Sequence, residues 1–222
     1  MIDTLHTVDP HWEAEFQSLA FTTEALFAHP EPDDQPLGRL AARAASVLAD
    51  WEEIDLDGRA LRRDAIRAAA RVRAADIAME EALELLVKDV LATTEGNRES
   101  DLYLRFFPES HEDLIEMGLD ASLPIVMGFL VALDQDDGLP ERVRAHEDAL
   151  RPALQLGNGA LADRAEALAN LGRHQARVEA WKETAVATRR NLYRALGRIA
   201  EQRGLPARWV RAFFLHPPAP SE

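Results

Sequence analysis

The sequence predicts an all-α protein: an elongated helical bundle of two tandem, pseudo-repeated helical-hairpin units with long coiled-coil-like helices. Apolar residues recur every three or four positions over long tracts, which is the pattern of one helix face. Residues 30–108 and residues 132–217 each contain a short helical tract, a long helical tract that ends at a glycine, and an aromatic segment with a Phe-Phe pair, in the same order. Such self-similarity indicates a duplicated unit. Glycines and prolines stand where such helices are expected to begin and end.

An N-terminal helix within residues 1–29 is predicted to precede the first repeat. Asp9 and Pro10 suit its N-cap and first turn, and the helical pattern extends to about Phe27. The prolines and aspartates that follow, up to Pro36, predict a loop.

The first repeat, residues 30–108, is predicted to hold a short helix that ends at Asp57 and Gly58, and then a long helix. The long helix reaches Gly96, where glycine suits a left-handed C-cap. Its apolar seam steps by four and three without a break: Leu61, Ala65, Ala68, Val72, Ala75, Met79, Ala82 and Leu86. Other apolar residues lie beside the seam: Ile66, Ile77, Leu83, Val87 and Val90. A face this wide needs more than one neighbouring helix, so we expect a bundle.

Residues 109–131 are predicted to connect the repeats through apolar helices. Ser110 begins a capping-box pattern, and Ser122 with Pro124 suits the start of an apolar helix. The apolar stretch at residues 123–133 is about eleven residues long, well under the ~20 that cross a bilayer. We therefore interpret it as a buried core helix, and no membrane span is expected.

The second repeat, residues 132–217, has a predicted short helix up to Asn158 and Gly159 and a long helix up to Gly204. The apolar positions of the long helix are spaced by threes, fours and sevens: Leu161, Leu168, Leu171, Val178, Ala185, Leu192, Leu196 and Ile199. Residues 218–222 are predicted to form a disordered tail. All these parts are expected to belong to one compact domain.

Charge is distributed unevenly along the chain, whose formal net charge is −14. Residues 1–58 carry thirteen acids and two bases, hence −11, and residues 160–222 carry six acids and eleven bases, hence +5. We expect either solvated helix faces or an attraction between the acidic head and the basic tail, within one molecule or between neighbours. The overall charge argues against nucleic-acid binding, in which Lys and Arg replace counterions.

No catalytic, cofactor-binding or metal-binding signature stands out. The chain has no cysteine, which excludes disulfides, thiolate nucleophiles and Cys-ligated metals. No phosphate-binding loop, dinucleotide fingerprint or nucleophile elbow occurs. Enzymatic activity is therefore disfavoured, and no cofactor is expected. The first residues lack the basic and apolar regions of a signal peptide, so a cytoplasmic location is expected.

Three histidines have acidic neighbours that could support chemistry. The candidate groups are His111 with Glu112 or Asp113 for a metal ion, and His146 with Glu147 and Asp148, or His174 with Glu179, for acid–base catalysis. Single histidines among helical charges are more often surface residues, and the polarity of a helix start explains the first group more simply.

Two aromatic segments are the candidate partner-binding sites. Their residues are Tyr103, Phe106 and Phe107 in the first repeat and Trp209, Phe213 and Phe214 in the second. Aromatic residues three or four positions apart share a helix face and bury a large area. Each segment either folds over its own hairpin and closes the bundle, or protrudes to anchor a protein partner or a second subunit.

The leading functional hypothesis is a non-enzymatic interaction or assembly protein that self-associates as a homo-oligomer or binds a protein partner. One alternative is the binding of a small molecule in a pocket between the repeats, lined by Trp51, Trp181 and Met127. Another is that the acidic residues 1–58 mimic a nucleic acid and bind a basic protein.

Overall fold

The computed structural model describes residues 11–29, 34–108 and 110–216. The predicted cap at Asp9 and Pro10 and the predicted tail at residues 218–222 lie outside these ranges. Within them the chain forms helices and no strand, and its long helices pack together. The all-α prediction is therefore confirmed.

Two helices are much longer than the rest. In chain order the helices are α1 (His11–Phe27), α2 (Gln35–Thr93), α3 (Asp101–Phe106), α4 (His111–Glu116), α5 (Leu119–Gln135), α6 (Glu141–Arg144), α7 (Glu147–Arg203) and α8 (Ala207–Arg211). The predicted end of the first helix, at Phe27, is confirmed.

The chain forms two compact units, each with its own apolar core. Unit 1 consists of Met1–Arg62 and Asn170–Glu222, and unit 2 of Arg63–Ala169. The helices α2 and α7 each contribute residues to both units. The two units are groups of residues that contact one another in the fold, and unit 1 combines segments from distant parts of the sequence. The repeat boundaries predicted along the sequence, 30–108 and 132–217, therefore stay predictions.

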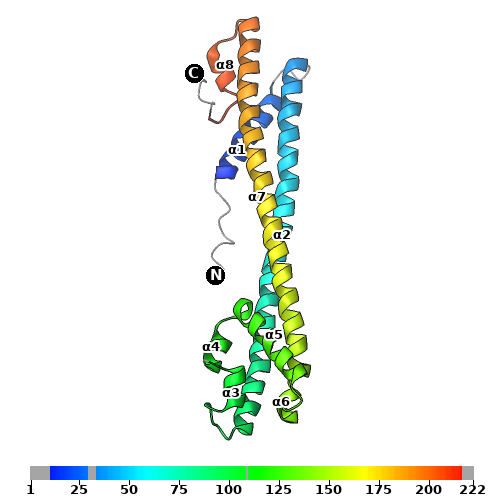
Figure 1. The fold of residues 1–222 in the computed structure, drawn as a ribbon. Coiled ribbons are helices and arrows are strands. Elements are labelled where there is room, and N and C mark those ends of the chain that lie inside the picture. The colour runs from blue at the N-terminus through cyan, green and yellow to red at the C-terminus, as the bar shows by residue number, and fades with distance from the viewer. Residues whose placement is uncertain (1–10, 30–33, 109, 217–222) are drawn as a thin grey trace. The chain divides into compact units, whose positions relative to one another are not determined.

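The core of unit 1 is formed by α1, α8, the N-terminal part of α2 and the C-terminal part of α7 (Figure 1). Three indole rings pack together in this core, Trp12 stacked on Trp51 and Trp181 tilted against Trp51. The centroids of Trp12 and Trp51 are 4.6 Å apart, and those of Trp51 and Trp181 are 4.5 Å apart. The buried indole N–H of Trp181 donates a hydrogen bond of 2.8 Å to the carbonyl oxygen of Val47. This N–H group is therefore hydrogen-bonded, as buried polar groups usually are.

Ion pairs inside unit 1 join the acidic head of the chain to its basic tail. Arg177 pairs with Asp57 at 2.7 Å, and Arg203 pairs with Asp34. The hydrogen bond from Arg203 lowers the pKa of the Asp34 carboxyl. Of the two alternatives that the sequence left open, these pairs therefore favour attraction between head and tail within one molecule.

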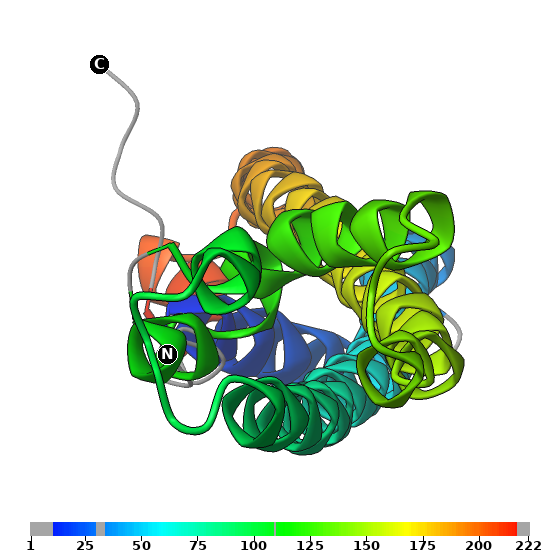
Figure 2. The same ribbon diagram turned by 60° about the horizontal axis from the view of Figure 1, so that its bottom comes forward.

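The core of unit 2 is formed by α3 to α6, the C-terminal part of α2 and the first part of α7. Figure 2 shows α5 running across the beginning of α7. Phe106 and Phe107 of the first aromatic segment meet Phe129 of α5, with ring centroids 5.4 and 5.7 Å apart. These near-perpendicular contacts are the preferred edge-to-face geometry of aromatic rings.

The predicted helix breaks at Asp57-Gly58 and at Asn158-Gly159 are wrong, because α2 and α7 run through both positions without interruption. Gly58 is needed for close packing: a Cβ atom there would lie 2.5 Å from Nε2 of His174. A helical glycine costs about 1 kcal/mol relative to alanine, and at this position the ring of His174 takes up the space that a side chain would need.

The helix ends agree with the sequence in part. Gly204 has a φ of +67°, and the N–H of Leu205 bonds back to Ala200 at 2.8 Å, so the predicted left-handed C-cap of α7 is confirmed. At the end of α2 both Glu95 and Gly96 have positive φ, +50° and +82°. The non-glycine residue therefore shares the left-handed conformation predicted for Gly96 alone.

Of the two predicted serine caps, one is confirmed and one is wrong. Ser110 caps α4, since its hydroxyl accepts from the N–H groups of Glu112 and Asp113 at 3.2 and 3.4 Å. The apolar helix begins at Leu119, so Ser122 lies within it and its hydroxyl donates to the Leu119 carbonyl oxygen at 3.3 Å.

The predicted apolar seams are mostly buried. All eight residues of the first seam are buried or partly buried. In the second seam only Leu168 is exposed, and its neighbour Ala167 is buried in its place. Two residues predicted to widen the first seam, Ile66 and Ile77, are also exposed, because periodicity locates an apolar face more reliably than its width.

Candidate functional site

The two aromatic segments are largely core. Five of their six rings are buried: Tyr103, Phe106, Phe107, Phe213 and Phe214. The sixth, Trp209, is partly exposed and contacts the ring of Phe213 at a centroid distance of 5.0 Å. The partner-binding role predicted for these segments therefore has only the Trp209 ring at the surface to support it.

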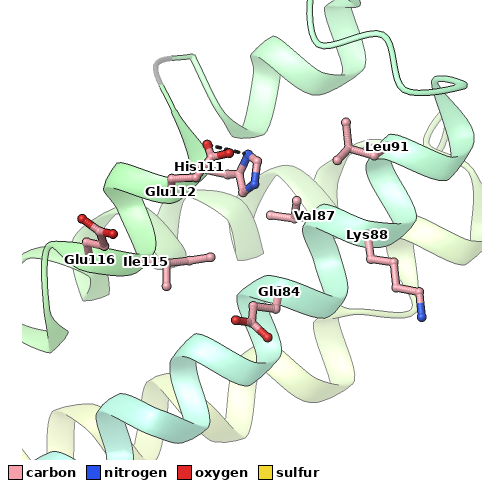
Figure 3. A pocket seen from close by; sticks show the side chains of 8 residues that line it. All are labelled: Glu84, Val87, Lys88, Leu91, His111, Glu112, Ile115 and Glu116. Carbon is pink, nitrogen blue, oxygen red and sulfur yellow. Dashed lines mark ion pairs between the residues drawn. The ribbon is translucent and has the colours of Figure 1, made fainter.

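A cleft lies between α2 and α4 in unit 2 (Figure 3). Its volume is about 570 Å³, which lies within the range of small-molecule sites. The residues that line it are Glu84, Val87, Lys88, Leu91, His111, Glu112, Ile115 and Glu116. It thus combines an apolar wall with three carboxylates, one ammonium group and one imidazole.

His111 is held in this cleft through one ring nitrogen. Its Nδ1 lies 2.9 Å from the Tyr103 hydroxyl and 3.1 Å from a carboxylate oxygen of Glu112. The hydroxyl of Ser110 donates to Glu112 at 2.7 Å and, with a backbone N–H, lowers the pKa of that carboxyl to about 2. Both contacts are made by Nδ1, so Tyr103 and Glu112 together fix the orientation of the imidazole ring.

An imidazole oriented by a carboxylate is a usual general base. The carboxylates of Glu84, Glu112 and Glu116 suit a ligand that donates hydrogen bonds. The sequence pointed to His111 and Glu112, whereas Tyr103 and the α2 residues join them only through the fold.

His146 is paired with Asp89 of α2 rather than with Glu147 or Asp148, its predicted partners. Its Nε2 lies 2.9 Å from Asp89, which Arg142 also contacts at 2.5 Å. The hydrogen bonds from Arg142 and His146 lower the pKa of the Asp89 carboxyl. Asp89, Arg142 and His146 therefore link α2 to α6 and to the residues that follow α6.

His174 is buried in unit 1 and is not joined to Glu179, its predicted partner. The Glu179 carboxylate is 2.9 Å from the ammonium of Lys182, while Nδ1 of His174 is buried without a hydrogen bond to any described residue. Burial lowers the pKa of His174, and the nearby charges of Arg177 and Arg62 lower it further.

Acidification below about pH 6.5 is expected to destabilise the protein through His174. The folded state favours the neutral ring, so the unfolded chain binds the proton more readily. The free energy of unfolding therefore keeps its full value above the unfolded pKa and falls as the pH drops through it. Urea unfolding at about pH 7.5 and about pH 5.5 should show a smaller loss for His174→Leu than for the wild type. An equal loss in both proteins would contradict this assignment.

A second hollow, the aromatic groove, lies between α1 and α2 in unit 1, with a volume of about 540 Å³. Six of its lining residues define it: the aromatic Trp12, Phe16 and Trp51 and the acidic Glu13, Glu52 and Asp55. Of the three residues predicted to line a pocket, Trp51 lines this groove, and Trp181 packs against Trp51 at a ring-centroid distance of 4.5 Å. Met127 belongs to unit 2, where its side chain is 57% exposed on α5.

Within residues 11–29, 34–108 and 110–216, no three His, Asp or Glu side chains are grouped so that they could hold a metal ion. In the same ranges no helix has the length and apolar character needed to span a bilayer. A comparison of the chain with protein-family models, curated proteins and solved structures found no match in any of the three.

Proposed function

We propose that this protein is a non-enzymatic assembly protein that self-associates through one face of α5. Six exposed apolar or small residues define this α5 face: Ala121, Pro124, Ile125, Met127, Gly128 and Val131. No charged residue occurs between Asp120 and Asp134. A continuous apolar surface of this kind is typical of an interaction site, and it is the observation that carries the proposal.

A second copy of the chain is the partner that suits the α5 face best. Ile125 and Val131 lie three positions before and three positions after Gly128. An antiparallel pair of α5 helices that cross at Gly128 therefore places Ile125 of one copy opposite Val131 of the other. The glycine at the centre lets the two helix axes approach closely. Repulsion at the N-terminal end of the face is reduced because Arg164 pairs with Asp120 at 2.7 Å. Such a self-complementary contact closes as a two-fold dimer.

Light scattering tests this proposal directly. The wild-type protein is expected to be a dimer at concentrations of about 1 to 100 μM. The double variant Ile125→Glu/Val131→Glu should be monomeric with unchanged helix content, because both side chains are exposed, by 38% and 49%, and a glutamate pair at the interface would be desolvated.

The control places the same change on another exposed apolar residue of unit 2. Leu85 on α2 is 52% exposed and lies outside the α5 face, so Leu85→Glu should leave the dimer intact. A wild type that is monomeric over the whole range, or a dimer that survives the double variant, would remove the proposal.

We further propose that the chain arose by duplication of a helical unit. The helices α1, α2 and α3 have 17, 59 and 6 residues, and α5, α7 and α8 have 17, 57 and 5. Each long helix ends in a left-handed turn and is followed by a buried Phe-Phe pair. This order supports the repeats at 30–108 and 132–217 and adds α1 and α5 as a corresponding pair. The coiled-coil-like character of α2 and α7 belongs to the same proposal.

The other candidate functions differ in their support. Small-molecule binding is favoured by the cleft between α2 and α4 in unit 2 and by the hollow between α1 and α2 in unit 1. Mimicry of a nucleic acid has less in its favour, because Arg177 and Arg203 of the same chain already pair with acids of residues 1–58. A cytoplasmic location is part of the proposal on the sequence argument alone.

A further inference from the structure

The aromatic groove of unit 1 combines ring surface and negative charge in one hollow. Trp12 and Phe16 are partly exposed, and their rings meet at 62° with centroids 6.5 Å apart. Trp51 is buried beneath them, 4.6 Å from Trp12 and 6.5 Å from Phe16. Trp12 lies nearly parallel to Trp51 and covers it, so the ring surface that a ligand can reach comes mainly from Trp12 and Phe16, with Trp51 packed behind Trp12.

Carboxylates lie around these rings. Glu13 follows Trp12 on α1, and Glu52 follows Trp51 on α2. Within the described part of the chain neither glutamate has an ion-pair partner, while Asp55 pairs with Arg59. Three carboxylates against one guanidinium leave the groove with a formal charge of −2.

We propose that the aromatic groove binds a small quaternary or tertiary ammonium ion. The faces of aromatic rings carry negative potential and attract alkylated ammonium groups. Such an ion also buries methyl groups against the rings, which a hydrated inorganic cation does not. The carboxylates of Glu13 and Glu52 supply the long-range attraction.

The same features argue against other ligands. An anion would be repelled by the net negative charge of the groove. A metal ion would need several converging ligands, and no such group occurs in the described ranges. A neutral apolar molecule would gain nothing from Glu13 or Glu52. The match between charge and ring surface therefore selects an organic cation.

Titration of the full chain with tetramethylammonium or choline, followed by calorimetry and by tryptophan fluorescence, tests this inference. Both ions should bind. The uncharged isostere of choline, with a tert-butyl group in place of the trimethylammonium group, should bind at least about tenfold more weakly, because the cation–π attraction is lost. Equal binding of choline and its isostere, or no binding of either cation, would overturn the inference.

Variants locate the binding in the groove. Trp12→Ala and Glu52→Gln should each weaken binding of choline by about three- to tenfold, and Trp12→Phe should recover part of the affinity. The matched controls are Trp209→Ala and Glu24→Gln, which change the same residue types outside the groove and should bind as the wild type does. If Glu52→Gln, an exposed change that keeps the fold, binds choline with wild-type affinity, the groove is not the site.

This inference does not rest on self-association, since the α5 face belongs to unit 2. The variant Ile125→Glu/Val131→Glu should bind choline as the wild type does. Loss of the dimer with binding retained would separate the two proposals, and so would a dimer that fails to bind choline.

Discussion

Replacing Phe106 by alanine is expected to lower the free energy of unfolding by about 3–5 kcal/mol. The ring is 1% exposed and meets Phe129 at 5.4 Å and Phe107 at 6.3 Å. Truncation removes its buried apolar area and leaves a cavity that neighbouring rings fill only in part. Domains of ordinary stability have about 5–15 kcal/mol in total, so the loss should be large enough to shift the whole unfolding curve.

Urea unfolding followed by far-UV circular dichroism measures this loss. The matched control is Leu104→Ala on the same short helix, where the side chain is 44% exposed and truncation should cost well under about 1 kcal/mol. A Phe106→Ala variant no less stable than Leu104→Ala would show that α3 does not close the unit 2 core. It would then return the first aromatic segment to consideration as a partner-binding site.

Replacing Trp181 by alanine is expected to cost a similar amount, about 3–5 kcal/mol, in the core of unit 1. The indole is 4% exposed, its ring packs 4.5 Å from Trp51, and its N–H bonds to the Val47 carbonyl oxygen of α2. Alanine loses both the ring contact and the hydrogen bond between the two long helices.

Trp181→Phe separates these two contributions. It keeps an aromatic ring against Trp51 and removes the N–H donor, so it should cost about 1 kcal/mol for the hydrogen bond and a further small amount for lost area. Thermal and urea unfolding of both variants give the comparison. If Trp181→Ala were no less stable than Trp181→Phe, the contact between the rings of Trp181 and Trp51 would contribute little to the stability of this core.

The sequence was most informative where local chemistry decides the outcome. The spacing of residues such as Ala75, Met79 and Leu86 correctly located the buried face of α2, because a helix repeats every 3.6 residues whatever it packs against. The left-handed turn at Gly204 and the cap at Ser110 were also predictable, since each involves backbone groups only a few positions away.

Predictions failed where a distant contact outweighed a local preference. Gly58 was interpreted as a helix break, yet it lies in an unbroken helix because the ring of His174, far along the chain, fills the space beside it. The pairing of His146 with Asp89 was missed for the same reason, since the nearest acids in sequence are Glu147 and Asp148. A spacing rule considers neighbours along one helix and cannot identify a partner on another.

The aromatic groove of unit 1 also depended on contacts between residues far apart in the sequence. Of the residues that line the aromatic groove, the sequence pointed only to Trp51 as part of a pocket, and Trp12, Phe16 and Glu13 were not predicted. Only the packing of α1 against α2 turns them into one groove, because ligand sites need side chains that converge in space.

By itself, the sequence determined that this protein is built of helices, where α1 and the two long helices end and which faces the long helices bury, because helix formation depends on local periodicity and end groups. Only the tertiary structure decided that the chain gathers into two cores, that most of the aromatic segments are interior and that an acidic groove faces solvent. Those outcomes depend on contacts between residues far apart in the chain, for which no local pattern exists.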